Sequence, residues 1–282
     1  NGTEYRSASG APGHKYWQNG VDYNISVNLD TATHKVSGTI TITYKNNSPD
    51  QLPYLWLQLD QNSFKETSRG YAVTPARSRY GAQGEKFEGG YNISNIVVQQ
   101  KKKDVKFTSL VEDTRTQFPL DKPVAASGDV VTIKMDYSYI VPKAGSDRTS
   151  RLTTKNGEIY AIAQWFPRMS VYDDVIGWNT LPYWGGGEFY CEFGDITFDI
   201  TVPANHIVMG SGELLNPQEV FTAEQLKRWN AAKQSDATVH IRSEAEVNDP
   251  KSRPSAQKLT WKFKITNARD AAWATSRSFV LD

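Results

Sequence analysis

Residues 21–29 read V-D-Y-N-I-S-V-N-L, and residues 36–44 read V-S-G-T-I-T-I-T-Y. In both stretches apolar side chains alternate with polar ones, which is typical of a β-strand with one buried face. The turn-like residues 30–34 join the two stretches, so we predict a β-hairpin. This hairpin indicates a fold built on antiparallel strands.

The same period of two recurs along most of the chain. Two segments, 61–90 and 145–156, lack it and are rich in polar residues, so we expect long loops there. Many short strands separated by turns favour an all-β, mainly antiparallel fold, a saddle-like β-sandwich. The further predicted strands are 55–59, 93–100, 105–111, 117–120, 131–139, 158–164, 193–202 and 259–265.

One helix interrupts this pattern, and we predict it over residues 222–233. Thr222 is a suitable N-cap, and Gln225 stands where a capping box requires a Glu or Gln. We expect a polar loop at 244–257. The predicted organisation is a flexible lead over 1–20 and one β domain over 21–282, with 213–257 as an insertion.

Composition excludes several classes of function. The 32 basic and 31 acidic residues leave a net charge of +1, which gives no field to attract nucleic acid. A single cysteine, Cys191, excludes an internal disulfide and a cysteine-based metal cluster. No apolar run reaches the roughly 20 residues that a membrane-spanning helix needs. We therefore expect neither a nucleic-acid partner nor a membrane-spanning segment.

The sequence offers no complete catalytic site. None of the four histidines is followed by Glu-x-x-His, and His240 and Glu244, four apart on a strand, are too distant to bind one metal ion. The pair Asp173 and Asp174 could bind a cation, act in acid/base catalysis or cap a turn. Glycines 185–187 could bring the backbone against a ligand or form a turn.

Residues 164–191 form a segment without strand periodicity that holds three Trp, three Tyr and two Phe. Such a segment either packs on the sheet as a local cap or belongs to a pocket or contact surface. We favour the second interpretation. The candidate residues of this surface are Arg168, Asp173, Tyr183, Trp184 and Gly186.

Five stretches carry a resemblance to a known family. In their order and spacing, residues 22–30, 36–42, 44–52 and 57–64 resemble the opening of M1-type zinc aminopeptidases. Residues 266–274, T-N-A-R-D-A-A-W-A, resemble the N-x-R-D-F-A-W-A segment that ends the N-terminal domain of that family. The resemblance therefore covers nearly the whole chain.

This resemblance implies a saddle of antiparallel sheets that packs on a thermolysin-like catalytic domain following residue 282. It implies zinc in the parent enzyme and none in this fragment. The family reaction removes the N-terminal residue of a peptide, with zinc polarising the carbonyl and activating a water. The implied partners are the chain's own C-terminal catalytic domain and the peptide substrate. We expect an excised piece of an exported protein, periplasmic or extracellular, with its signal removed.

The family's N-terminal domain lends a glutamine to the pocket for the first residue of the substrate, and Gln164 matches it. Many members have a glutamate two positions later, where this chain has Phe166, so the resemblance implies a more apolar pocket. Arg168 and Asp173 fall near the family's Arg- and Pro-containing segment, at compressed spacing.

Two other functions fit the same sequence. One is a non-catalytic β-sandwich that binds carbohydrate or protein through aromatic loops such as 178–190. The other is a scaffold whose parent has lost its zinc site. A His-Glu-x-x-His motif after residue 282 would favour the aminopeptidase.

Overall fold

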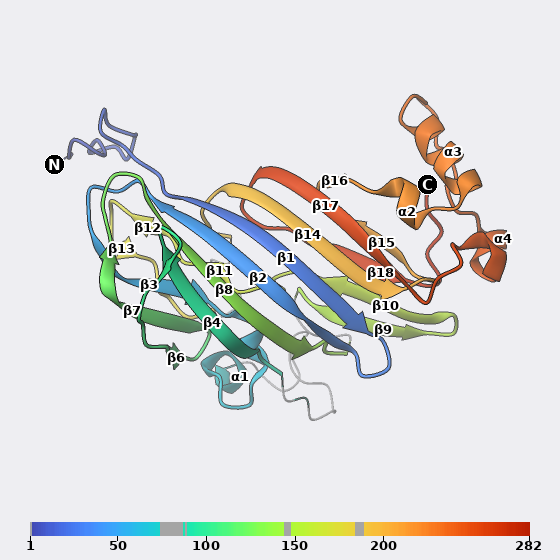
Figure 1. Ribbon diagram of the computed structural model, residues 1–282, viewed down its shortest axis with the longest axis horizontal. Helices are drawn as coiled ribbons and strands as arrows, with labels where there is room; N and C mark the ends of the chain where they lie inside the picture. Colours follow the sequence, from blue (N-terminus) through green and yellow to red (C-terminus); the bar gives the residue numbers. More distant parts are fainter. Residues whose placement is uncertain (1, 74–86, 88, 144–147, 184–188) are drawn as a thin grey trace.

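The computed structural model describes residues 2–73, 87, 89–143, 148–183 and 189–282. Its centre is a curved, twisted sheet of eight strands (Figure 1). All pairings in this sheet are antiparallel except that of β1 with β14, which is parallel. In spatial order the strands are β16 (Glu213–Leu214), β17 (Lys258–Ala268), β14 (Gly194–Pro203), β1 (Gly20–Asp30), β2 (Lys35–Asn46), β8 (Asp129–Ile140), β4 (Asn92–Gln100) and β5 (Lys103–Asp104).

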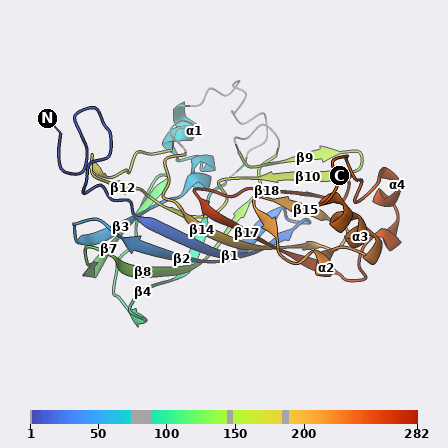
Figure 2. The same ribbon diagram turned by 90° about the horizontal axis from the view of Figure 1, so that it is seen from above.

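Smaller sheets form a second layer, and Figure 2 shows β9, β10 and β18 lying over one side of the large sheet. The layers are joined by the Met169 N–H, which donates to the hydroxyl of Tyr23 on β1 at 2.9 Å. One smaller sheet has the order β15 (Ile207–Gly210), β18 (Trp273–Ser276), β10 (Gly157–Ile162) and β9 (Ser150–Thr154). A second has the order β11 (Arg168–Met169), β3 (Leu52–Gln58), β7 (Arg115–Val124) and β6 (Leu110–Glu112). In the last, β12 (Tyr172–Asp173) pairs with β13 (Gly177–Trp178).

The predicted all-β, sandwich-like fold is confirmed. The alternating apolar residues of β1 and β8 are buried between the layers, as the period of two requires. Gly38 permits the close pairing of β1 with β2, because a Cβ at this position would lie 1.9 Å from the main-chain oxygen of Ser26. Every residue from Gly20 to Asp30 has a partner on β2, so the predicted hairpin is also confirmed.

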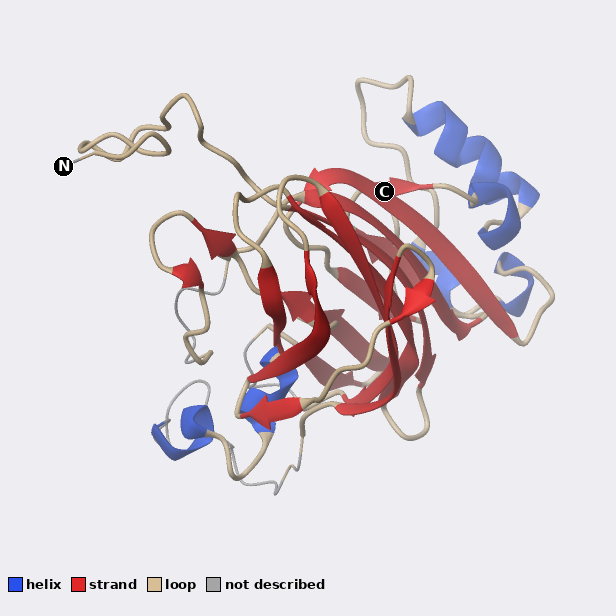
Figure 3. Ribbon diagram, turned by 60° about the vertical axis from the view of Figure 1, so that its left-hand side comes forward, coloured by secondary structure: helices blue, strands red, loops and turns tan. Residues whose placement is uncertain are grey.

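The predicted helix is present as α3 (Ala223–Ala232), the longest helix in the described residues. Both bonds of its capping box form, each at 3.3 Å, between the backbone and side chains of Thr222 and Gln225. Figure 3 shows the helices outside the strands in two separate groups. The remaining ones are α1 (Arg69–Val73), α2 (Pro217–Val220), α4 (Glu244–Val247) and the 3₁₀ helices η1 (Asp60–Phe64) and η2 (Pro250–Ser252).

Several loop predictions were wrong. Residues 244–257 contain α4, whose N-cap Ser243 forms a capping box with Glu246, a pattern that the sequence did contain. Residues 145–156 contain β9, an edge strand in which no side chain is fully buried, so it shows no alternation. The segment 61–90 contains most of η1 and all of α1, while its residues 74–86 and 88 lie outside the described ranges.

Some strand boundaries also differ from the prediction. Of the strand expected at 105–111, only its last two residues belong to β6. The short strands β15 and β18 were missed, because runs of four residues show too little periodicity. Among the described residues, none of the helices has the length and apolar character to span a membrane.

Candidate functional site

Three consecutive buried polar residues, Asp60, Gln61 and Asn62, form the first turn of η1 immediately after β3 and Leu59. Their exposed fractions are only 2–3%, although their residue types are normally found at the surface. A buried polar group is stable only when it is hydrogen-bonded. Each of the three bonds to a different segment of the chain, so η1 joins those segments.

Asp60 forms a buried ion pair with Arg168 of β11. The Oδ2 atom of Asp60 accepts from Nη2 of Arg168 at 2.6 Å and from Nε at 3.1 Å. The Nη1 atom of Arg168 lies 3.0 Å from Oδ2 of Asp270 and 3.3 Å from the sulfur of Cys191. Burial disfavours the charged guanidinium, but the two carboxylates outweigh it and hold the pKa of Arg168 above its usual value.

Gln61 bonds to the residue singled out as substrate-binding. Its Nε2 donates to the main-chain oxygen of Gln164 at 2.9 Å, and the hydroxyl of Tyr91 donates to the same oxygen at 3.4 Å. Gln164 lies two residues after the end of β10 and has a φ of 50°, in the left-handed region. Its side chain is 3% exposed, and its Nε2 has no hydrogen-bond partner among the described residues.

Asn62 completes the arrangement. Its Oδ1 accepts from the Tyr91 N–H at 2.9 Å, and its Nδ2 donates to the main-chain oxygen of Asp113 at 3.0 Å. The ring of Tyr91 packs edge-to-face on Tyr137 and Tyr139 of β8, with centroids 5.8 and 5.7 Å away. Tyr91 is therefore fixed at its backbone, its ring and its hydroxyl.

Phe166 lies deeper than Gln164. It is fully buried and packs edge-to-face against Tyr23 and Trp165, with both centroid distances 5.1 Å. The indole nitrogen of Trp165 donates to the main-chain oxygen of Ala271 at 2.9 Å. The first part of the aromatic segment, residues 164–171, thus belongs to the core.

Residues 172–183 and 189–190 of that segment are partly or largely exposed. Asp173 caps the turn between β12 and β13, where its Oδ1 accepts from the N–H groups of Val175 and Ile176, both at 2.9 Å. The Tyr190 hydroxyl donates to the other oxygen of Asp173 at 2.6 Å, and the Tyr183 N–H donates to Thr114 at 2.8 Å. Of the other predicted residues, Trp184 and Gly186 lie outside the described residues.

The N-terminal lead packs on the turn between β12 and β13. Arg6 binds both carboxylate oxygens of Asp174, at 2.6 and 2.9 Å, and the side chain of Asp174 is only 5% exposed. Trp17 stacks on Tyr172 with ring centroids 5.8 Å apart. The turn is thereby fixed between the lead and the body of the domain.

Large apolar side chains are exposed in this turn and in the segments 179–183 and 189–193. Leu181 is 79% exposed, and the other members expose between 43% and 65% of their surface, although large apolar side chains are usually buried. We use "apolar rim" for the set Val175, Ile176, Leu181, Phe189, Tyr190 and Phe193.

Glu192, between Tyr190 and Phe193 in the chain, is 7% exposed. Its carboxylate accepts from the Tyr172 N–H at 3.3 Å. Burial raises the pKa of Glu192 to about 8, since the hydrogen bond only partly offsets the loss of water.

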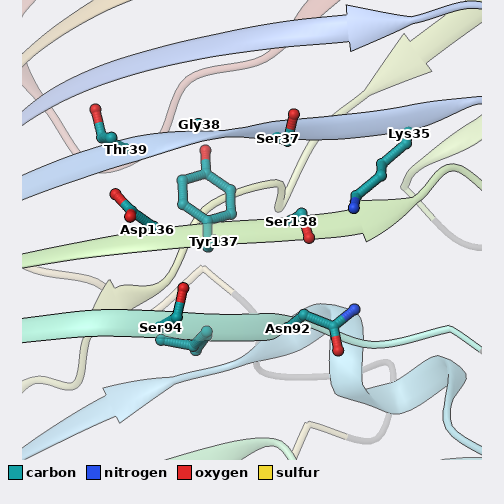
Figure 4. Close-up of a pocket in the computed structure, with 10 residues that line it drawn as sticks. Lys35, Ser37, Gly38, Thr39, Asn92, Ser94, Asp136, Tyr137 and Ser138 are labelled. Carbon is teal, nitrogen blue, oxygen red and sulfur yellow. The ribbon is translucent and has the colours of Figure 1, made fainter.

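Two further features bear on ligand binding. No three His, Cys, Asp or Glu side chains of the described residues come together in a metal-binding arrangement. A shallow depression of about 400 Å³ lies between β2, β4 and β8 (Figure 4). Its lining includes Lys35, Asn92 and Asp136 but none of the predicted site residues.

Sequence reasoning missed the residues that surround Gln164 and Arg168. Asp60 and Gln61 stand at unspecified positions of the stretch 57–64, and Asp270 lies in the stretch 266–274. Both stretches carry the resemblance, and that was the only available signal. Nothing in the sequence indicated Tyr91.

No protein-family model and no curated protein sequence matches this chain. Among solved structures, it is similar to a mutant M1 zinc metallopeptidase from Deinococcus radiodurans bound to a Tyr-Ser-Ala substrate, with 12% identity and a TM-score of 0.44. A two-domain M1 zinc metallopeptidase mutant bound to L-tryptophan gives 12% identity and a TM-score of 0.43. The match covers 94% of this chain and 44% of each of those chains. Likeness of this degree does not assign the chain to a family.

Proposed function

We propose that this chain is the N-terminal accessory domain of an M1-type zinc aminopeptidase, a hydrolase that removes N-terminal residues from peptides. In this proposal the domain lends Gln164 to the pocket for the first residue of the substrate. It packs on a catalytic domain that follows in the same protein, and it is not catalytic alone.

The observation that carries this proposal is the meeting of three separate stretches at Arg168. Asp60 and Asp270 come from the stretches 57–64 and 266–274, which were singled out because they resemble that family, and Arg168 falls near the family's Arg- and Pro-containing segment. Their ion pairs make them one buried cluster. This contact supports the alignment, and with it the match of Gln164, four residues before Arg168, to the family's glutamine.

The chemistry of Gln164 suits the proposed role. A neutral amide can donate and accept hydrogen bonds with a peptide without requiring a charged partner. Its Nε2 is buried and unpartnered in the described part of the chain, which leaves a donor available. Trp165 and Phe166, the next two residues, are buried and pack on each other. Zinc, held by the following domain, would polarise the scissile carbonyl and activate a water.

We expect Gln164→Met in the full-length parent to lower kcat/KM for aminoacyl-nitroanilides about 2- to 12-fold, the effect of one lost hydrogen bond of roughly 0.5–1.5 kcal/mol. Methionine has a similar volume, so the melting temperature should change little. As a control, Gln225→Met removes a buried glutamine whose Nε2 bonds to Ser252 at 2.8 Å, and it should affect stability alone. Unchanged catalysis in Gln164→Met would make Gln164 structural.

We expect the apolar rim to contact the catalytic domain, because a large exposed apolar surface usually marks an interaction site. Amide hydrogen exchange in 172–183 and 189–193 should then be slower in the full-length protein than in the isolated chain. The helix α3 serves as an internal reference and should exchange equally in both. Equal exchange of the rim segments would mean that this surface only covers the domain itself.

A further inference from the structure

We propose that Gln61 is a positioning residue, which orients Gln164 toward the substrate by holding its main-chain oxygen. The inference rests on the proposed function, since it assumes that Gln164 contacts the substrate. Gln61 itself need not touch the substrate.

The backbone at Gln164 needs such support. A φ of 50° is unfavourable for a residue with a side chain, and it persists only where the surroundings impose it. The oxygen of Gln164 accepts from Gln61 at 2.9 Å and from Tyr91 at 3.4 Å. The shorter bond comes from Gln61, so we assign the main restraint to this residue.

Gln61 is rigid because both neighbours in η1 are fixed. Asp60 is paired with Arg168, and Asn62 bonds to the Tyr91 N–H and to the Asp113 oxygen. The side chain of Gln61 is 2% exposed and has little room to adopt another rotamer. A rigid donor transmits its own position to the group that it binds.

A purely structural role would explain Gln61 less well. The carbonyl of Gln164 can only accept, so the amide nitrogen of Gln61 must face it and its Oε1 must face away. That Oε1 is buried without a hydrogen-bond partner in the described residues. A buried unpaired acceptor offsets the gain from the one bond, so Gln61 contributes little to stability.

The test is a double-mutant cycle in the full-length parent, with aminoacyl-nitroanilides as substrates. We expect Gln61→Met to raise KM about 2- to 12-fold with kcat nearly unchanged, since a weaker contact to the first residue reduces binding. In a Gln164→Met background the same change should have no further effect on KM, because the contact is already absent. The matched control is Gln100→Met, since Gln100 is also buried and donates to a main-chain oxygen, that of Lys122, at 2.9 Å.

The outcomes separate this inference from the proposed function. If Gln164→Met impairs catalysis while Gln61→Met does not, or if Gln61→Met acts equally in both backgrounds, the inference is wrong and the proposed function stands. If Gln164→Met leaves catalysis unchanged, both are wrong. Should Gln61→Met fail to fold, Tyr91→Phe removes the second donor to the same oxygen. It should then raise KM less, and only when Gln164 is present.

Discussion

Replacing Arg168 with methionine is expected to lower the free energy of unfolding by about 3–5 kcal/mol, the usual effect of removing one partner of a buried ion pair. Arg168 and Asp60 are 1% and 3% exposed, so water cannot replace the lost guanidinium. Asp270 loses the same partner. Urea denaturation of the isolated chain at pH 7 measures the change.

The matched control is Arg69→Met. Arg69 pairs with Glu112 at 3.0 Å, but both side chains are about half exposed, so the loss should be at most about 1 kcal/mol. In Arg168→Met, Asp270 loses the guanidinium that lowers its pKa, so the pKa of this carboxyl rises further in the folded state. The loss in free energy of unfolding should therefore become smaller as the pH falls and the carboxyl becomes protonated. Equal losses in the two variants at pH 7 would contradict the assigned role of Arg168.

Glu192→Gln is expected to stabilise the domain at alkaline pH by up to ~4 kcal/mol relative to the unchanged chain. The pKa of Glu192 is raised from 4.5 to about 8 in the folded state, so the folded protein binds this proton more tightly than the unfolded chain does. The stabilisation is complete below about pH 4.5 and is lost as the pH rises toward 8. Glutamine resembles the protonated acid but does not titrate, so the variant keeps the stabilisation.

Urea denaturation between pH 5 and 9 tests this prediction. The difference between the variant and the unchanged chain should grow from pH 5 to about 8 and then level off. Glu213→Gln, at an exposed position, is the control and should follow the unchanged chain. A constant difference at all pH values would mean that Glu192 remains ionised in the folded state and is compensated by its surroundings.

The strands that the sequence predicts well are those with one fully buried face. In β1 and β8 every second residue enters the core. The alternation of apolar and polar residues in the sequence is therefore enough to predict these strands. β9 has no buried residue and pairs on one side with β10, which left no alternation to detect. The helix α4 could have been predicted, because Ser243 and Glu246 have the capping-box spacing.

The candidate site was only half predictable. The resemblance singled out Gln164 and Arg168, but Asp60 and Gln61 look like part of a polar turn in the sequence. Their burial depends on partners 108 and 103 residues away, Arg168 for Asp60 and Gln164 for Gln61. Local patterns carry no information about contacts of that range, so polar residues buried by tertiary pairing were missed.

The parallel pairing of β1 with β14 has a consequence for synthesis of the chain. Tyr23 pairs with Ile196, so one edge of β1 remains without its neighbour until about 170 more residues have been made. At roughly 5–20 residues per second, that delay is on the order of 10–35 seconds. During this time the hairpin of β1 and β2 exposes an unpaired strand edge, which can pair with another nascent chain. The central strand of the finished sheet is therefore the one most in need of protection while the protein is being made.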